Sequence, residues 1–243
     1  MIRLGVCADV KFINELAEIG YDYLEYNLAK LQGLSDEEYA QVCALVDNAP
    51  IKVVGEEVNA QAIHDYLDKA FSRAKRLGVK VVVFGSGNSR RVPEGFDTGI
   101  AWRQIGNYLR MVERHAMEND ITVVIEPLRA GECNIMNFVS EATLMASLIQ
   151  MPHIAVLADT YHMAMGSEPF SALTMAGKQL KHVHIANAIG RKYPKEGDGE
   201  RYEDIFSTLK EMGYEGRVSV EGGCDEFSRD ARDAFKVLNA VRA

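Results

Sequence analysis

The chain has 243 residues, a net charge of −8 and an apolar fraction of 47%. The negative balance argues against a nucleic-acid partner, because phosphate contacts need clustered Lys and Arg, and against an anionic membrane surface. No run of about 18 apolar residues occurs, and the first residues lack the apolar stretch of a signal peptide. The four cysteines are scattered without a C-x-x-C pair, which favours a reduced, cytoplasmic protein.

Short β-branched segments alternate with longer amphipathic ones along the chain. The segments that predict strands are 3–8, 21–26, 51–54, 79–84, 121–126, 154–159, 181–186 and 218–222. Between them, apolar residues recur at helical spacing. Ser35 and Glu38 predict a capping box at the start of SDEEYAQVCALVDN, residues 35–48. The next helix is expected to end near Gly78, and the last to begin near Phe227.

Eight strand–helix units of roughly 30 residues each match the length of βαβ repeats. This alternation predicts an α/β fold with a parallel sheet covered by helices, and eight units predict a single (β/α)8 TIM barrel. A doubly wound open sheet is the alternative, but it typically has fewer strands and a glycine-rich fingerprint after the first one. No Pro/Gly/Ser-rich linker interrupts the sequence, so we expect one domain over residues 1–243.

Titratable residues stand at the ends of the last four predicted strands. They are Glu126, Asp159, His184 and Glu221. Because side chains alternate along a strand, all four would point to the barrel interior at the end where barrel active sites lie. Three carboxylates crowded together would repel one another unless a cation joined them. One imidazole with three carboxylates suits Mn2+ or Mg2+ better than a structural Zn2+.

At these residues the chain resembles the xylose-isomerase-like TIM-barrel superfamily, in particular its sugar isomerases and epimerases related to the ketose 3-epimerases. The segments that carry the resemblance are VVIEPLRAGECN, VLADTYHM, LKHVHIANAIGR and GYEGRVSVEGG. The resemblance runs from the first strand to the last helix. It implies a small-molecule carbohydrate substrate, oligomers of identical chains, and a divalent metal: Mn2+ first, with Mg2+, Co2+ or Zn2+ as alternatives.

The resemblance also implies a role for particular residues. The family's metal ligands are matched by Glu126, Asp159, His184 and Glu221, and the two glutamates match its acid–base pair. The residues that would orient the substrate are Glu132, His162 and Arg191. Epimerases often carry an acidic residue between the histidine and the arginine, where this chain has Asn187 and one extra residue of spacing. His182 lies deeper in the same strand and is expected to be a supporting or core residue.

The same residues could serve several reactions. One glutamate would remove a proton beside a carbonyl, and the other would return a proton to the resulting enediolate. Return to the same carbon gives an epimer, whereas return to the adjacent carbon interconverts aldose and ketose. An inosose-dehydratase-type lyase would instead expel water. An endonuclease IV-like phosphoesterase would need additional rim histidines and a more positive surface than this chain offers.

The stretch VVFGSGNSRRVPEGF, residues 82–96, follows the fourth predicted strand. Its glycines are typical of a turn. Alternatively, they would expose backbone N–H groups to an anion with Arg90 or Arg91 nearby. That second interpretation would fit a phosphorylated or carboxylated sugar.

Overall fold

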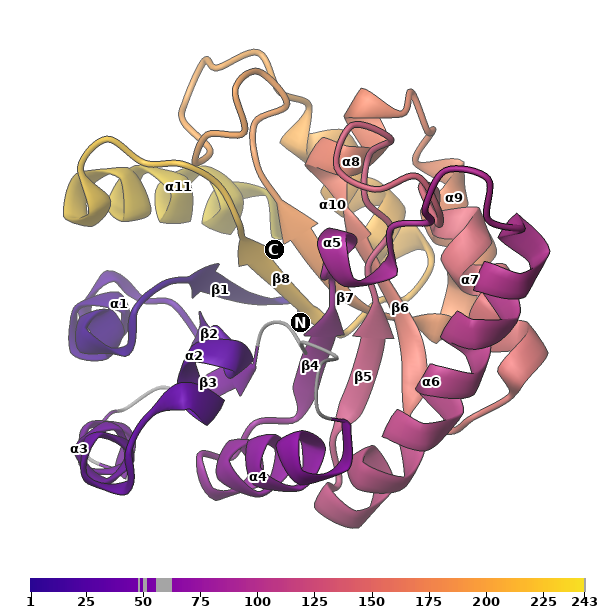
Figure 1. Cartoon of the computed structure of the whole chain (residues 1–243). Coiled ribbons are helices and arrows are strands. Elements are labelled where there is room, and N and C mark those ends of the chain that lie inside the picture. Colours follow the sequence, from indigo (N-terminus) through magenta and orange to yellow (C-terminus); the bar gives the residue numbers. More distant parts are fainter. Residues whose placement is uncertain (48, 50–51, 56–62, 243) are drawn as a thin grey trace.

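The sheet of this protein closes on itself. The computed structural model describes residues 1–47, 49, 52–55 and 63–242. Eight parallel strands pair in chain order, and β1 also pairs with β8 (Figure 1). The strands are β1 (Arg3–Cys7), β2 (Tyr23–Tyr26), β3 (Lys52–Gly55), β4 (Val81–Phe84), β5 (Thr122–Ile125), β6 (Ile154–Asp159), β7 (Leu180–Ile185) and β8 (Arg217–Val220). The predicted (β/α)8 barrel is therefore confirmed.

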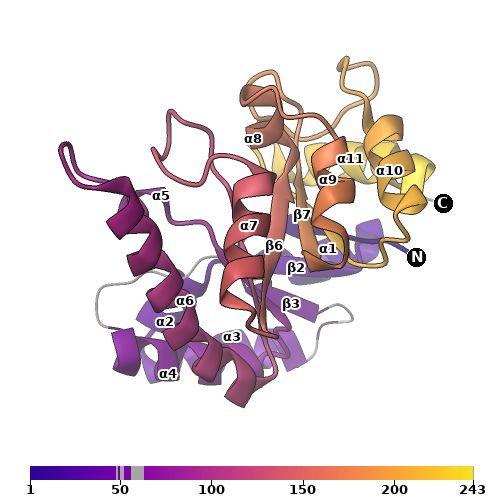
Figure 2. The same ribbon diagram turned by 90° about the vertical axis from the view of Figure 1, so that its right-hand side faces the viewer.

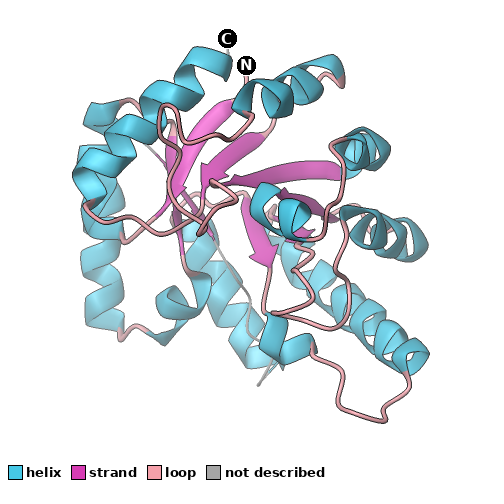
Figure 3. Cartoon of the chain, turned by 90° about the horizontal axis from the view of Figure 1, so that it is seen from above, coloured by secondary structure: helices cyan, strands magenta, loops and turns pink. Residues whose placement is uncertain are grey.

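Helices surround the strands, as the view from above shows (Figure 3). The α-helices are α1 (Ile13–Ile19), α2 (Leu28–Gly33), α3 (Asp36–Asp47), α4 (Ile63–Arg76), α5 (Gly87–Arg90), α6 (Thr98–Asn119), α7 (Val139–Ile149), α8 (Thr160–Met165), α9 (Ser171–Ala176), α10 (Tyr202–Glu211) and α11 (Phe227–Arg242). Short 3-10 turns are η1 (Val10–Phe12) and η2 (Gly177–Gln179). Within the described ranges, none of these helices is long and apolar enough to cross a membrane.

Local signals in the sequence account for several helix ends. The Ser35 N–H donates to Oε2 of Glu38 at 2.8 Å, and the Glu38 N–H donates to Oγ of Ser35 at 3.2 Å, which confirms the capping box. The helix expected to end near Gly78 ends at Arg76, and the last helix begins at Phe227 as predicted. Two edge residues of predicted elements, Asn48 and Ile51, lie outside the described residues.

The alternation of side chains along each strand divides the apolar core into two parts. Outward-facing residues pack in the layer between strands and helices, where Phe71 of α4 and Phe206 of α10 are fully buried. In Figure 2 the helix α7 stands in front of the sheet beside β6, the strand against which it packs. Inward-facing residues form a smaller cluster inside the barrel: Tyr23, Val81, Val83, Val124, Ala155 and Leu157.

The remaining interior of the barrel is polar. Glu25, His182 and Ser219 are completely buried there. The Tyr23 hydroxyl donates to Oγ of Ser219 at 2.8 Å, and the Ser219 hydroxyl donates to the Glu25 carboxylate. The same carboxylate lies 2.9 Å from Nε2 of His182. Because buried polar groups are costly without partners, this network fixes the side chains on which the next layer of the barrel rests.

A substitution at Gly5 of β1 would test how tightly the barrel interior is packed. A Cβ atom at Gly5 would lie 2.3 Å from ring carbons of Tyr23, whose hydroxyl is held by Ser219. We expect Gly5→Ala to lower the free energy of unfolding by about 1–3 kcal/mol, the usual cost of overpacking. Urea denaturation would measure it. The control Gly33→Ala, where a Cβ meets nothing within 4 Å, should change stability by less than about 0.5 kcal/mol; equal losses in both variants would contradict the prediction.

Candidate active site

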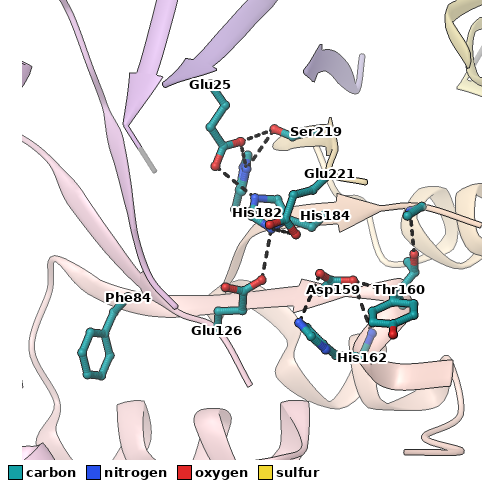
Figure 4. A network of polar contacts seen from close by, with 12 residues as sticks. Glu25, Phe84, Glu126, Asp159, Thr160, His162, His182, His184, Ser219 and Glu221 are labelled. Carbon is teal, nitrogen blue, oxygen red and sulfur yellow. Dashed lines mark hydrogen bonds and ion pairs between the residues drawn. The ribbon is translucent and has the colours of Figure 1, made fainter. Parts of the chain in front are cut away.

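Four strand-end residues meet at the C-terminal end of the barrel. Glu126 and Glu221 directly follow β5 and β8, Asp159 is the last residue of β6, and His184 is the last but one of β7. One ligand atom from each lies within 4.8 Å of the others, and Figure 4 shows the side chains turned toward one another. The structure thus brings together the four residues that the sequence predicted to share one point.

The two oxygens of the Asp159 carboxyl make different contacts. Oδ1 accepts the backbone N–H groups of Tyr161 at 2.7 Å and His162 at 3.4 Å, and so caps α8. Oδ2 faces the site and lies 3.1 Å from Nη2 of Arg191. The residue is 1% exposed. Burial, together with the nearby Glu221 carboxylate, raises the pKa of Asp159 to about 7.

The two glutamates sit in different electrostatic surroundings. Oε1 of Glu126 lies 3.1 Å from Nδ1 of His184, and burial raises the pKa of this carboxyl. Burial alone would also raise the pKa of Glu221, but His184 and Arg191 lower it overall. Oε2 of Glu221 lies 3.2 Å from Nδ1 of His184. Without a bound metal ion, the environment of the site therefore shifts the pKa values of the two glutamates in opposite directions, up for Glu126 and down for Glu221.

The donor set suits a hard divalent cation. Glu126, Asp159 and Glu221 offer three carboxylates around the single imidazole of His184, and these are the ligand types that Mn2+ and Mg2+ accept. The raised pKa values of Glu126 and Asp159 reflect burial and mutual repulsion. A divalent cation would offset that repulsion. The residues present therefore fit the metal that the sequence analysis expects.

Glu25 is a residue of this site that the sequence analysis missed. It is the third residue of β2, and its Oε1 lies 3.0 Å from Nε2 of His184. Burial alone would raise the pKa of Glu25, but His182 and His184 lower it well below its usual range. An ionised carboxylate only accepts hydrogen bonds, so Nε2 of His184 carries the proton. Its Nδ1, on the other side of the ring, faces Glu126 and Glu221.

Cys7 also approaches this network. Ligand atoms of Cys7, Glu25 and His184 lie within 4.8 Å of one another. Both oxygens of Glu25 are already used, Oε1 by His184 and Oε2 by His182 and Ser219. The geometry therefore favours a supporting hydrogen-bond network here over a second metal position.

The three residues expected to orient the substrate surround the same cavity. Glu132, His162 and Arg191 line a space of about 400 Å3 together with Glu126 and Glu221. His162 is 2% exposed, and its Nε2 has no hydrogen-bond partner among the described residues. Oε2 of Glu132 lies 3.9 Å from that nitrogen. A buried polar atom left without a partner at a cavity wall is suited to a polar ligand.

Arg191 makes more contacts with the site than the sequence suggested. Its Nη2 lies 3.1 Å from Oδ2 of Asp159 and 2.5 Å from Oε2 of Glu221. Its guanidinium also lies over the Tyr161 ring, 5.1 Å from the ring centre. The backbone of Arg191 is left-handed, with φ of 51°. Arg191 therefore offsets carboxylate charge as well as facing the cavity.

A closed parallel barrel with titratable side chains at the C-terminal ends of its strands defines the class of (β/α)8-barrel proteins, whose active sites lie at that end. The sequence profile of one family in that class matches residues 13–241. The chain belongs to that family, the xylose isomerase-like TIM barrel.

Its relatives include sugar epimerases, which are isomerases. A D-psicose 3-epimerase of Enterocloster bolteae is 25% identical over 230 residues, which cover 87% of this chain and 75% of that protein. A 3-dehydro-D-guloside 4-epimerase of Escherichia coli is 26% identical over 121 residues, 49% of this chain and 45% of that protein. The D-psicose 3-epimerase of Clostridium cellulolyticum H10, solved with D-tagatose, shares the fold with a TM-score of 0.85 at 20% identity, covering 99% of both chains.

The contact between Glu25 and His184 predicts an effect on metal binding. In Glu25→Gln, the amide NH2 would face a ring N–H of His182 or His184, so one histidine would lose its acceptor. We expect the affinity for Mn2+ to fall about 10- to 100-fold, the usual effect of removing a carboxylate behind a metal-ligating histidine. Calorimetric titration would measure it. Glu113→Gln, another buried carboxylate paired with a histidine, is the control, and equal affinities in all three proteins would contradict the role of Glu25.

The raised pKa values of the ligands Asp159 and His184 predict that metal binding depends on pH. Below about pH 7 the carboxyl holds a proton that a metal ion must displace. Affinity for Mn2+ should therefore rise from pH 6 to pH 8, by up to about tenfold per displaced proton per pH unit below the pKa. Titrations in buffers of different ionisation enthalpy would count the protons released. Glu168→Gln removes a carboxyl whose pKa is also raised, in the loop between α8 and α9, and should keep the profile. A flat profile without proton release would refute the assignment.

Proposed function

We propose that this protein is a metal-dependent sugar isomerase or epimerase that works through an enediolate, with Glu126 and Glu221 as the acid–base pair. We further propose that it acts as a single domain over residues 1–243. The observation that carries the proposal is the convergence of the two glutamates, from β5 and β8, on one cavity beside Asp159 and His184. The kinship with sugar epimerases supports the same conclusion.

The cavity provides separate groups for proton transfer and for holding the substrate. Glu221, which lines the cavity from the end of β8, is placed to remove a proton from the carbon beside a carbonyl. Glu126, which lines the same cavity from the end of β5, is suited to deliver a proton to the resulting carbanion. His162 Nε2 would meet a substrate oxygen, because it makes no hydrogen bond with the residues that the structure describes.

The metal would be held by Glu126, Asp159, His184 and Glu221, with Mn2+ as the first candidate and Mg2+, Co2+ or Zn2+ as alternatives. Such an ion acts as a Lewis acid that makes the C–H beside a carbonyl more acidic. The chain's own contribution is to fix these four side chains: α8 holds Asp159 by its cap, and Glu25 holds the His184 ring.

The alternative reactions differ in what the site would need. A phosphoesterase related to endonuclease IV would need several histidines around more than one metal. In the described residues, the two clusters able to hold a metal share one histidine, His184. An inosose-dehydratase-type lyase would use the same four residues and is separated from an epimerase by its product.

Exchange of substrate hydrogen with solvent tests the proposal. Metal-stripped protein would be loaded with Mn2+ and incubated in D2O with ketoses, aldoses, their phosphates and inososes. We expect metal-dependent deuterium incorporation at carbon, followed by NMR. Glu126→Gln and Glu221→Gln should each slow the exchange by about 10²-fold or more at saturating metal, because each removes a proton-transfer group.

The position of the label decides between the reactions. Label at the epimerised carbon indicates an epimerase, label at the adjacent carbon an aldose–ketose isomerase, and loss of water a dehydratase. The control variant Glu113→Gln removes a buried carboxylate outside the barrel and should exchange at the wild-type rate. Stoichiometric Mn2+ binding without exchange on any substrate would overturn the enediolate proposal.

A further inference from the structure

Two consecutive arginines after β4 have different surroundings. Arg90 is buried and donates through Nη1 to the carbonyl of Phe84 and through Nη2 to that of Glu126. It thereby ties the end of β4 to the end of β5. Arg91 is exposed at the cavity that holds Glu126 and Glu221, and its Nη2 donates to the carbonyl of Glu132 at 2.8 Å. The first arginine supports the fold, while the second lines the cavity.

The glycines before these arginines bring the loop against the site. A Cβ at Gly85 would lie 2.1 Å from Oε2 of Glu126, and one at Gly87 would lie 3.0 Å from the carbonyl of Glu132. A side chain at either position would require its neighbours to shift. The glycines therefore serve close packing, which places Arg91 and the neighbouring Asn88 at the cavity wall.

Arg91 differs from the other cations of the cavity in lacking a counter-charge. Arg191 pairs with Asp159 and Glu221. Nearby, Arg129 pairs with Glu132 at 2.7 Å. No carboxylate of the described residues lies within 4.0 Å of the Arg91 guanidinium. The charge of Arg91 is thus left for something that enters the cavity.

The cavity is large enough for a sugar with an added group. Its volume of about 400 Å3 lies in the range of small-molecule sites. Glu126 and Glu221 line the part where carbon chemistry would occur, while Asn88 and Arg91 come from the β4 loop. The buried Nε2 of His162 in the same wall lacks a hydrogen-bond partner among the described residues. This second observation points independently to a polar ligand.

We propose that the substrate is a sugar with an anionic group, carboxylate or phosphate, remote from the reacting carbons, and that Arg91 binds that group with help from Asn88. The inference rests on the proposed sugar isomerase or epimerase function and specifies its substrate class. A guanidinium forms its strongest hydrogen bonds with carboxylate and phosphate oxygens. Arg91 is pre-positioned for this by the Glu132 carbonyl.

Three matched ketoses test the inference on the Mn2+-loaded enzyme: D-fructose, D-fructose 6-phosphate and D-fructuronate, which differ in the terminal group. Deuterium exchange would give kcat/KM for each. We expect one or both anionic ketoses to exceed D-fructose, with the phosphate and carboxylate arms identifying the group. In Arg91→Ala, the ratio of kcat/KM for an anionic ketose to kcat/KM for D-fructose (the anionic-to-neutral ratio) should fall about 10- to 100-fold, as for loss of a charged hydrogen bond. Arg91→Lys should restore part of the ratio, and Arg110→Ala, an exposed arginine on α6, should leave it at the wild-type value.

The outcomes separate this inference from the proposed function. If D-fructose exchanges and Arg91→Ala leaves the anionic-to-neutral ratio unchanged, the anion subsite is overturned while the proposed isomerase or epimerase function stands. An equal fall in kcat/KM for all three ketoses would show that Arg91 has a purely structural role, which would also overturn the subsite. If no ketose exchanges, calorimetric binding of D-fructose 6-phosphate and D-fructuronate decides: weaker binding to Arg91→Ala supports the subsite although the reaction fails, and equal binding overturns it.

Discussion

The site depends on the contacts made by the imidazole of His184. Glu25 lies on one side of the ring, 3.0 Å from Nε2, while Glu126 and Glu221 lie 3.1 and 3.2 Å from Nδ1 on the other. Burial alone would lower the pKa of His184, but Glu25 and Glu221 raise it well above its usual range. The histidine therefore joins the buried network inside the barrel to the carboxylates at its end, and a shift of the ring would disturb both.

Carboxylates that lie close together repel one another unless nearby positive charges offset their charge. Arg191 reaches Asp159 and Glu221 from a backbone position that is itself left-handed, with φ of 51°. A guanidinium cannot be deprotonated in a protein, so this compensation persists at every pH at which the site would work. Burial raises the pKa of Glu126 and outweighs the charge of Arg191, which lowers it. The closer contact of Arg191 with Glu221 is thus one physical reason why the pKa values of the two glutamates shift in opposite directions.

Most of the fold, and the placing of the strand-end residues, could be predicted because both follow from local patterns. Each strand–helix unit carries its own signals, such as the cap at Ser35, and strand alternation alone puts Asp159 and His184 on the inner face. Glu25 was missed because Tyr26 follows it in β2, so nothing marks it as a strand-end residue. Its role depends on partners 157 and 159 residues away. The contacts of Arg191 could not be predicted either, because they depend on the conformation of the loop after β7.

The two halves of the barrel contribute differently to the cavity. The groups suited to proton transfer come from β5 and β8, whereas the loop after β4 supplies Asn88 and Arg91 to the wall. Asp9 and Lys30, from the loops after β1 and β2, line a neighbouring pocket that shares Glu221 and Arg191 with the cavity. A glutamate that removes a proton acts in the same way in an epimerase and in an aldose–ketose isomerase. The outcome then depends on which carbon the substrate presents to the returning proton, and hence on how the walls hold its far end. In the proposed function, reaction type and substrate choice would therefore depend on the loops from both halves that line the cavity, with Asn88 and Arg91 after β4 and Glu132, His162 and Arg191 after β5, β6 and β7.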